Sequence, residues 1–476
     1  MVLLLAILMQ NGAADSFAAD SGAAENAAIG LRPNVVVLLA DDCTKSDLGC
    51  YGGQAQTPHL SRLAAEGLTF DRCYQAAPMC SPTRHCLYTG VYPVRSGAYP
   101  NHTFVRDGIG SIAQDLQAAG YRTALTGKRH VAPPSELPFE YSGTTGRIDW
   151  AAVDSLLGET AGGGPPFWLA VCSSSPHTPW DRGDANSYPP ESLRLPPTWV
   201  DTPETREAYS RYLAEVGDFD RQVGRLLDRL DRYELADDTI VIALSEQGSS
   251  FPFAKWTCSE AGVGSGMIIR WPGHVAPGSR TRALVEYVDV VPTILDATKT
   301  ETSRSLDGRS FLPVLLGDAR THKRFVFSEQ TSRGINEGPR WYGMRSVRDE
   351  RWRLVHNLTA EIPYRTALDT SGWFASWVRA AATDPEAAAI VARHRHRREW
   401  ELYDAEADPH CQVNRIDDAS LASEIAALKS ELAAWMQSQG DKGQETEKRA
   451  LDRMRRGSQR PNQKPKARPR SGPSIR

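Results

Sequence analysis

The sequence predicts an α/β protein with a large doubly wound sheet of mixed or parallel strands and a smaller C-terminal α+β domain. The apolar runs at residues 34–40 and 167–172, and the segment 237–244 with its apolar stretch 240–244, indicate strands buried on both faces. Amphipathic segments alternate with these runs, and this alternation favours a doubly wound sheet. Beyond about residue 340 the pattern changes to shorter strands, which we expect at 344–356 and 400–403.

Helices are expected between these strands. Thr57 can cap a helix that starts at Pro58 and ends at Gly67. A second helix covers 111–119 and is followed by a strand at 122–126. A long helix at 203–230 has apolar residues that recur every three or four positions, as on one buried face. A last amphipathic helix is expected at 420–437, with Ser420 as a candidate cap.

Composition restricts the function. The 476 residues have a net charge of −3, so the whole chain gives no electrostatic reason to bind nucleic acid. No run of 18 apolar residues occurs, which argues against a transmembrane segment. The eight cysteines form no C-x-x-C pair, so neither a zinc ribbon nor a thioredoxin-like site is expected, and their scatter is unlike a disulfide scaffold.

Four regions are predicted along the chain. Residues 1–32 form a leader and linker, because apolar residues 2–9 precede small residues as in a secretory signal; a plain N-terminal arm is the alternative. This predicts a periplasmic or secreted protein. A catalytic domain at 33–335 and a smaller domain at 336–440 follow. Residues 441–476 contain twelve Lys or Arg against four Asp or Glu, and we expect a disordered tail, either merely solvated or tethered to an anionic polymer.

Acidic and amide side chains follow two of the expected strands: Asp41-Asp42 and Glu246-Gln247. Ligands of open α/β sheets bind beyond the carboxyl ends of the strands. Three carboxylates and one amide oxygen there make a site that suits Ca²⁺ or Mg²⁺ rather than zinc. Loop formation or helix capping is the alternative for such residues.

The segment Cys80-Ser-Pro-Thr-Arg84, followed by Leu87-Tyr-Thr-Gly90, carries the strongest functional signal. By itself it could be a buried cysteine beside a turn. In this context the chain resembles the type I sulfatase family of the alkaline-phosphatase superfamily, whose signature is C-x-P-x-R followed by Thr-Gly. Further landmarks of that family occur in order: Asp41-Asp42, Thr57-Pro-His-Leu60, Gly127-Lys-Arg-His130, Pro176-His-Thr-Pro179 and Arg270-Trp-Pro-Gly273.

The resemblance implies an alkaline-phosphatase-like fold and a role for each matching residue. Cys80 would be converted to formylglycine by a formylglycine-generating enzyme or an anaerobic maturase. One hydroxyl of its hydrate would attack sulfur, and the other would expel sulfate. Ca²⁺ or Mg²⁺ would be held by Asp41, Asp42, Glu246, Gln247 and the converted Cys80.

The remaining roles concern cations and histidines. Arg84 would hold the hydrate oxygen, and Lys128 and Lys255 would hold the sulfuryl oxygens. His177 would be the general acid, with His130 near the nucleophile. Taken singly, these would be ordinary surface lysines and loop histidines; their shared register with Cys80 favours function.

A closer likeness is to the heparan sulfamidases, the N-sulfoglucosamine sulfohydrolases. It lies in residues 127–131, 344–358 and 400–410. This implies a sulfated saccharide as substrate and favours the N-sulfo group of glucosamine. An O-sulfatase, a phosphodiesterase or phosphonate hydrolase, and a non-catalytic glycan-binding protein remain alternatives. The chain departs from the family at Glu246-Gln247, where Asp with Asn or His is usual, and at Thr83, where Ser is usual.

Overall fold

The computed structural model describes residues 32–143, 146–335 and 341–454. Its large sheet has nine strands, in the order β4-β3-β5-β1-β6-β7-β2-β8, with β9 paired to β2. The central strand β1 is parallel to both of its neighbours, β5 and β6. The strands are β1 (Asn34–Leu39), β2 (Leu68–Tyr74), β3 (Arg122–Gly127), β4 (Glu140–Ser142), β5 (Phe167–Cys172), β6 (Thr239–Leu244), β7 (Gly264–Arg270), β8 (Ser279–Thr281) and β9 (Val285–Glu286).

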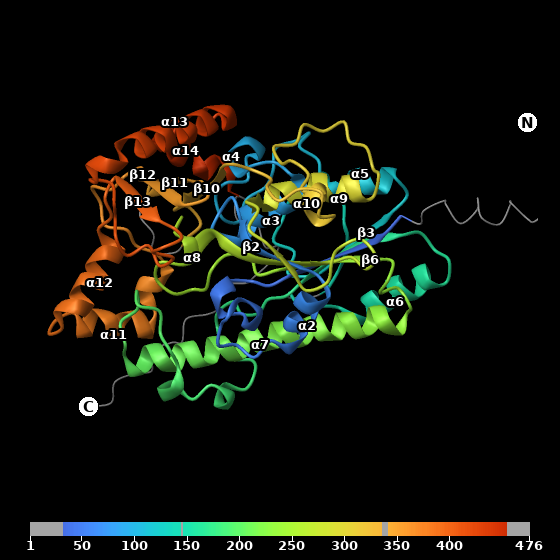
Figure 1. Ribbon diagram of the computed structural model, residues 1–476, viewed down its shortest axis with the longest axis horizontal. Coiled ribbons are helices and arrows are strands. Elements are labelled where there is room, and N and C mark those ends of the chain that lie inside the picture. The colour runs from blue at the N-terminus through green and yellow to red at the C-terminus, as the bar shows by residue number, and fades with distance from the viewer. Residues whose placement is uncertain (1–31, 144–145, 336–340, 455–476) are drawn as a thin grey trace, which may run out of the picture. The chain divides into compact units, whose positions relative to one another are not determined.

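Helices cover both faces of this sheet (Figure 1). Successive residues of β1 point to opposite faces, so Val36 packs into one core and Val37 into the other. One face carries α2 (Pro58–Glu66), α6 (Trp150–Ala161) and α7 (Pro203–Arg232); the other carries α3 (Cys80–Thr89), α5 (Ile112–Ala118), α9 (Val290–Ala297) and α10 (Leu312–Leu315). The predicted doubly wound α/β fold is confirmed.

The helix signals in the sequence act locally, except at Thr57 and Ser420. The Ser420 hydroxyl donates to Asp418 Oδ1 at 2.6 Å and does not cap the helix Ala422–Gln439. The Thr202 side chain caps α7 by accepting from the Thr205 amide at 3.1 Å. The predicted apolar face of α7 is buried along the helix. Thr57 does precede α2, but its hydroxyl accepts from the Gly49 amide at 3.0 Å and does not cap the helix. It therefore anchors the preceding loop instead.

A second, antiparallel sheet has the order β10-β11-β12-β13. Its strands are β10 (Val326–Thr331), β11 (Gly343–Arg348), β12 (Trp352–Asn357) and β13 (Trp400–Asp404), and α13 (Ala422–Gln439) packs on it. The single strand expected at 344–356 is a hairpin, because Asp349 accepts from the amides of Arg351 and Trp352 and turns the chain. The boundary expected at 335/336 is wrong, because it separates β10 from its partner β11.

The remaining helices are α4 (Pro93–Ser96), α8 (Glu260–Val263), α11 (Gly372–Ala380), α12 (Pro385–Arg395) and α14 (Gln444–Lys448). α14 corrects the prediction of a tail that is disordered from residue 441. Asp441 and Glu447 are buried, and both form ion pairs with the fully buried Arg345 of β11. A buried guanidinium needs carboxylate partners, and this need orders residues 441–454.

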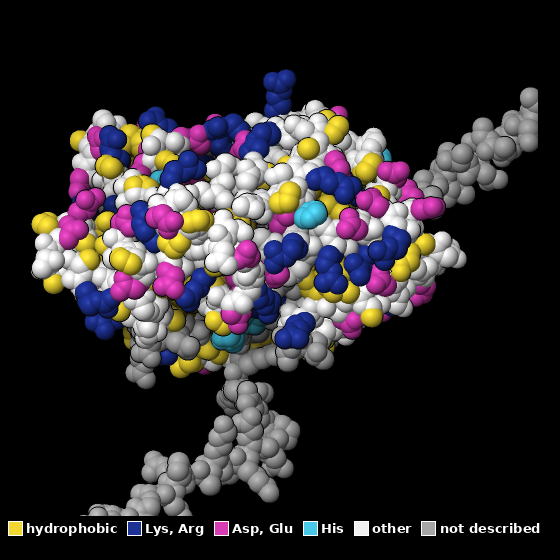
Figure 2. Space-filling model, turned by 90° about the horizontal axis from the view of Figure 1, so that it is seen from below, with side chains coloured by type: hydrophobic (Ala, Val, Ile, Leu, Met, Phe, Trp, Pro, Cys, Tyr) yellow, Lys and Arg dark blue, Asp and Glu magenta, His cyan; other side chains and the backbone are white. Residues whose placement is uncertain are grey.

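The predicted leader and the rest of the predicted tail, 455–476, lie outside the described residues, and only Arg32 of the leader is within them. In the described part of the chain, no helix has the length and apolarity needed to cross a bilayer. All eight cysteines lie in that part, and all are free thiols. On the face that carries α7, acidic and basic side chains are interspersed (Figure 2).

Candidate active site

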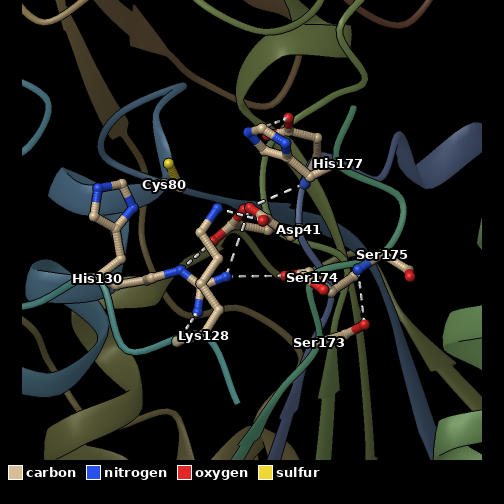
Figure 3. A network of polar contacts seen from close by, with 12 residues as sticks. Asp41, Cys80, Lys128, His130, Ser173, Ser174, Ser175 and His177 are labelled. Carbon is tan, nitrogen blue, oxygen red and sulfur yellow. Dashed lines mark hydrogen bonds and ion pairs between the residues drawn. The ribbon is translucent and has the colours of Figure 1, made fainter. Parts of the chain in front are cut away.

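Four adjacent parallel strands end at one edge of the large sheet, and each leads into polar residues. β1 is followed by Asp41 and Asp42, β6 by Glu246 and Gln247, β3 by Lys128 and β5 by the segment 173–177. Figure 3 shows side chains from three of these strand ends facing one another, with Asp41 between Lys128 and His177. The predicted clustering beyond the carboxyl ends of the strands is therefore present.

The backbone takes sharp turns to bring these side chains together. Asp42 and Glu246 have φ angles of 67° and 63°, in the left-handed region that non-glycine residues rarely adopt. Each such residue costs on the order of 1–3 kcal/mol, and this strain is common at functional sites. Gly127, before Lys128, has φ 85°, and a Cβ there would lie 2.0 Å from the Cys172 carbonyl oxygen, so only glycine fits.

Asp41, Asp42 and Glu246 form a buried oxygen cluster, with one carboxylate oxygen from each lying within 4.8 Å of the others. The Asp42 amide donates to Glu246 Oε2 at 3.3 Å, and Gln247 Nε2 donates to Asp42 Oδ1 at 2.6 Å. The longer side chains of Glu246 and Gln247 thus still reach the aspartates.

The cluster has the properties of a site for a hard divalent cation. Three of its oxygens are buried without a hydrogen bond among the described residues: Asp41 Oδ1 and Glu246 Oε1, which face the Arg84 guanidinium at 3.7 and 2.8 Å, and Gln247 Oε1. An oxygen-only donor set suits Ca²⁺ or Mg²⁺. The four predicted oxygen ligands therefore fit such an ion. The Cys80 thiol lies outside this cluster and contacts Asn101 Oδ1 at 3.9 Å.

Two lysines pair with the aspartates. Lys128 Nζ forms an ion pair with Asp41, and Lys255 Nζ with Asp42. Burial raises the pKa of both aspartates, but the nearby positive charges, led by the paired lysine, together outweigh burial and hold the pKa of each below its ordinary value. Burial lowers the pKa of each lysine, but the nearby negative charges, led by the paired aspartate, together outweigh burial and hold the pKa of each above its ordinary value. Both lysines are therefore cations at neutral pH.

Cys80 is the first residue of α3, a helix buried along its whole length. The positive end of the helix dipole lies there and favours negative charge at residue 80. Arg84, one turn later on the same face, is fully buried and connects three strand ends. Its Nε lies 2.8 Å from Glu246 Oε1, and it donates to the carbonyl oxygens of Lys128 at 2.9 Å and Ala40 at 3.3 Å.

Three histidines line the same space. His177 Nε2 lies 3.6 Å from Asp42 Oδ2, and its Nδ1 lies 2.6 Å from the Thr178 carbonyl oxygen. His130 Nε2 lies 3.0 Å from His102 Nδ1. Burial and the nearby charge of Lys128 lower the pKa of His130 to about 3, while burial and His130 lower that of His102 to about 4. The His102–His130 pair is therefore neutral at pH 7.

Asn101 and His102 were missed in the sequence. Asn101 contacts the Cys80 thiol, and its Nδ2 lies 3.4 Å from His102 Nε2. His102 also has a positive φ, 56°. The sequence neighbours of these two residues show no periodic pattern, and the contact with Cys80 arises only in the fold.

These groups open into one cavity of about 630 Å³. Its lining brings together five of the six predicted catalytic residues with the two that were missed: Cys80, Lys128, His130, His177, Lys255, Asn101 and His102. Arg84 lies beneath the cavity, between Cys80 and the oxygen cluster. The arrangement can hold an anion between two lysines above a divalent cation.

The second sheet supports this site from behind. Ser328 of β10 donates to the Gln75 carbonyl oxygen at 2.9 Å, and the Glu329 amide donates to the Ala76 carbonyl oxygen at 2.8 Å. Both contacts hold the segment that leads to Cys80. Tyr364 donates to the Trp256 carbonyl oxygen at 2.6 Å, next to Lys255.

Comparison with known protein families decides the identity of this site. The family described as "Sulfatase" matches residues 33–146 and 136–300, more than half of the chain. The chain belongs to the sulfatase family. A second family, "N-sulphoglucosamine sulphohydrolase, C-terminal", matches residues 250–365. The chain is therefore an enzyme, a sulfatase, and the resemblance inferred from its motifs is confirmed.

Relatives of this sulfatase match over most of their length. An "Ulvan-active sulfatase" of Formosa agariphila is 28% identical over 437 residues, covering 89% of this chain and 83% of the relative. The human N-sulphoglucosamine sulphohydrolase is 29% identical over 457 residues, covering 85% of this chain and 90% of the relative. Among solved structures, a protein in complex with its substrate D-glucosamine-2-N,6-O-disulfate has a TM-score of 0.66 at 21% identity, covering 87% of this chain and 99% of that one.

Proposed function

We propose that this sulfatase removes sulfate from a sulfated saccharide, with the N-sulfo group of glucosamine as its preferred target. Cys80 acts as formylglycine, and Asp41, Asp42, Glu246 and Gln247 hold Ca²⁺ or Mg²⁺. The observation that carries the proposal is the shared cavity, in which Cys80 faces two cationic lysines above a buried oxygen cluster.

Each group has a distinct chemical contribution. Bound metal would supply positive charge to polarise a sulfate oxygen, and the formylglycine hydrate would supply the nucleophilic oxygen. Lys128 and Lys255 bind the remaining sulfuryl oxygens as cations that the aspartates keep protonated. Arg84 fixes the start of α3 against the oxygen cluster through Glu246.

His177 is placed to donate a proton to the leaving group. The Thr178 carbonyl oxygen can only accept a hydrogen bond, so Nδ1 of His177 carries a proton. When the ring is charged, Nε2 carries the second proton and faces the cavity beside Asp42. An amine is a poor leaving group until it is protonated, so cleavage of an S–N bond depends on such an acid.

The preference for an N-sulfo group rests on the relatives. The human relative named N-sulphoglucosamine sulphohydrolase aligns over 85% of the chain, and the C-terminal profile of that group matches residues 250–365. That matched segment contains Lys255 and the Tyr364 contact that holds its loop. The Formosa relative, named for activity on ulvan, supports a sulfated polysaccharide as the broader substrate class.

A substrate screen tests the proposal. Sulfate release would be measured from glucosamine carrying a single N-, 3-O- or 6-O-sulfo group, from a 2-O-sulfated uronate, and from a phosphonate monoester. We expect fastest release from the N-sulfated sugar. Faster release from an O-sulfated sugar would replace the N-sulfo preference with an O-sulfatase, and turnover of the phosphonate alone would reject sulfate hydrolysis.

The nucleophile has its own test. Peptide mass spectrometry of the active enzyme should show residue 80 as the aldehyde or its hydrate, and Cys80→Ala should abolish turnover without unfolding the protein. Cys86, buried in the same helix, gives the matched control Cys86→Ala, which should retain activity. A fully active preparation with only the thiol at position 80 would refute the formylglycine mechanism. A binding protein without activity would retain glycan affinity in Cys80→Ala and show no turnover in the wild type.

Two further expectations belong to this proposal. The enzyme requires a formylglycine-generating or anaerobic maturation partner, and it acts in the periplasm or outside the cell. Co-expression with and without a maturation enzyme, followed by mass spectrometry of residue 80, tests the first. Fractionation of the native host, with the protein found only in the cytoplasm, would contradict the second.

A further inference from the structure

A second cavity of about 530 Å³ adjoins the active site and is lined by four arginines: Arg147, Arg182, Arg221 and Arg225. The lining also contains one acidic residue, Asp218. Positive charge therefore exceeds negative charge on its walls. None of these arginines belongs to the catalytic groups described above.

Three of the four arginines lack an acidic partner. Among the described residues, no carboxylate oxygen lies within ion-pair distance of Arg147, Arg182 or Arg225, whereas Arg221 pairs with Asp218 at 2.9 Å. Four of the six arginines on α7 pair with a carboxylate: Arg206, Arg211, Arg221 and Arg229. The unpaired charges of Arg147 and Arg225 are thus concentrated where the surface is hollow.

The other contacts hold the arginine side chains in place. The Arg225 guanidinium lies 4.5 Å from the centre of the Trp150 ring. Arg182 donates to the hydroxyls of Ser174 at 3.0 Å and Ser175 at 3.3 Å. Ordering these side chains before a ligand binds reduces the entropy lost on binding. A guanidinium also matches the paired oxygens of a sulfate or carboxylate better than an ammonium does.

The cavity borders the active site along two segments. Gly146 lines both cavities, and Ser174 of the second cavity precedes His177 of the first by three residues. The His177 amide donates to the Ser174 carbonyl oxygen at 3.2 Å, so one tight turn forms the wall between the two spaces. A ligand anchored among the arginines can extend directly to His177, where the leaving group is expected.

We infer that this arginine pocket binds a second anionic group, a sulfate or carboxylate, on a neighbouring sugar of the same saccharide. The inference rests on the proposed function, because it assumes that a sulfated saccharide occupies the active site. It specifies the substrate further: a polyanionic oligosaccharide rather than a singly charged monosaccharide. Released inorganic sulfate is the other possible source of the same chemistry.

The test compares a short and a long substrate. The probes are N-sulfated glucosamine and a heparin-derived tetrasaccharide with the same sugar at its non-reducing end. The double variant Arg147→Gln/Arg225→Gln should lower kcat/KM for the tetrasaccharide about tenfold, the size expected for two partly exposed charge-assisted contacts, and leave the monosaccharide unchanged. Arg211→Gln/Arg232→Gln, on exposed positions of α7 away from the pocket, loses the same charge and should change neither.

The outcomes are distinguishable. An equal loss of kcat/KM for both probes, or no loss for the tetrasaccharide, would contradict the proposal that the arginine pocket binds a second anionic group. Inhibition of the wild type by inorganic sulfate that weakens in the double variant, with tetrasaccharide kinetics unchanged, would also overturn it in favour of a product site. If the wild type hydrolyses neither probe, the proposed function fails. In that case calorimetry of tetrasaccharide binding to Cys80→Ala, with and without the arginine substitutions, still tests whether the arginine pocket contributes to affinity.

Discussion

Two buried clusters of acids and bases in this protein have similar composition and different surroundings. In the oxygen cluster, Asp41, Asp42 and Glu246 meet two lysines and Arg84 at the ends of strands. In the second cluster, between the two sheets, Glu260 bridges Arg348 and Arg353. The first borders the cavity of about 630 Å³ that contains Cys80 and is built on strained backbone; the second borders a smaller cavity of about 280 Å³ and is built on regular strands and a short helix.

This difference distinguishes a cluster expected to act in catalysis from one expected to stabilise the fold. Backbone strain and buried oxygens without hydrogen-bond partners lower the stability of a protein. Such features are retained mainly at sites that bind a ligand or catalyse a reaction. Ion pairs between regular elements instead fix how the elements pack. We therefore expect substitutions in the oxygen cluster to reduce activity more than stability, and substitutions between the sheets to do the reverse.

The largest effect is expected for Asp42→Asn, a nearly isosteric change. It removes a predicted metal ligand and the partner of Lys255, and kcat/KM for sulfate release should fall by on the order of 10³-fold. The substitution also leaves the buried Lys255 without its carboxylate partner, so the melting temperature should fall as well, and kcat/KM is compared at a temperature where the variant is folded. Metal content, measured by mass spectrometry of the dialysed protein, should fall in parallel.

Asp47→Asn is the matched control for Asp42→Asn. Asp47 is also a buried aspartate after β1, but it accepts from the Tyr209 hydroxyl at 2.6 Å and lies outside the cavity. Burial raises its pKa to about 6, so Asp47 is still mostly ionised at pH 7 and the substitution removes a buried charge comparable to that of Asp42. Similar losses of activity in both variants would show that buried charge after β1, rather than metal binding, is what matters.

The second effect concerns Asp441, the partner of Arg345 in the C-terminal segment. Asp441→Asn leaves a fully buried guanidinium with fewer charged partners and should lower the free energy of unfolding by about 3 kcal/mol. Urea unfolding measures this change. The folded fraction should retain kcat/KM within a few-fold, and Asp452→Asn, at an exposed acid of the same segment, is the control.

The third effect is a dependence of stability on pH. Burial raises the pKa of Glu260, but Arg348 and Arg353 outweigh burial and lower it to about 2. The folded state therefore binds fewer protons than the unfolded state between pH 4.5 and 2. The stabilisation, roughly 3 kcal/mol, is present above the unfolded pKa and is lost as pH falls through this range.

Glu260→Gln tests this dependence directly. The variant should be less stable than the wild type at pH 7, and the difference should shrink as pH falls from 4.5 towards 2. Thermal unfolding at a series of pH values measures it. A difference that stays constant with pH would show that the hydrogen bonds of residue 260, rather than its charge, stabilise the contact between the sheets.

The same contrast explains what the sequence could and could not predict. Asp41, Asp42, Glu246 and Gln247 follow long apolar strands, and neighbouring parallel strands must end together, so their meeting could be predicted. Cys80 and Arg84 were identified from a local motif. Residues 441–454 were not, because their order depends on Arg345, about a hundred positions earlier in the chain. The strand β10 was missed for a related reason: four of its six residues, Ser-Glu-Gln-Thr, are polar, and its partner β11 begins only at Gly343.

The smallest effect is expected for His102, the residue that connects the two kinds of region. It contacts His130 and Asn101 in the cavity, while its loop is held by the C-terminal segment, where Thr103 donates to the Arg453 carbonyl oxygen at 2.5 Å. His102→Gln keeps an amide that can hydrogen-bond to His130, and kcat/KM should fall about tenfold, the loss expected for one neutral contact near the reacting atoms. In His102→Ala kcat/KM should fall further, and in His59→Ala, on α2 away from the cavity, kcat/KM should not fall.

The pH dependence of kcat/KM gives a second readout. Burial lowers the pKa values of His102 and His130 below 5, so this pair should not change the activity of the wild type between pH 6 and 7. The Gln variant should show the same pH profile. An unchanged kcat/KM in both His102 variants would assign the residue to loop packing and restrict the catalytic groups to those predicted from the motifs.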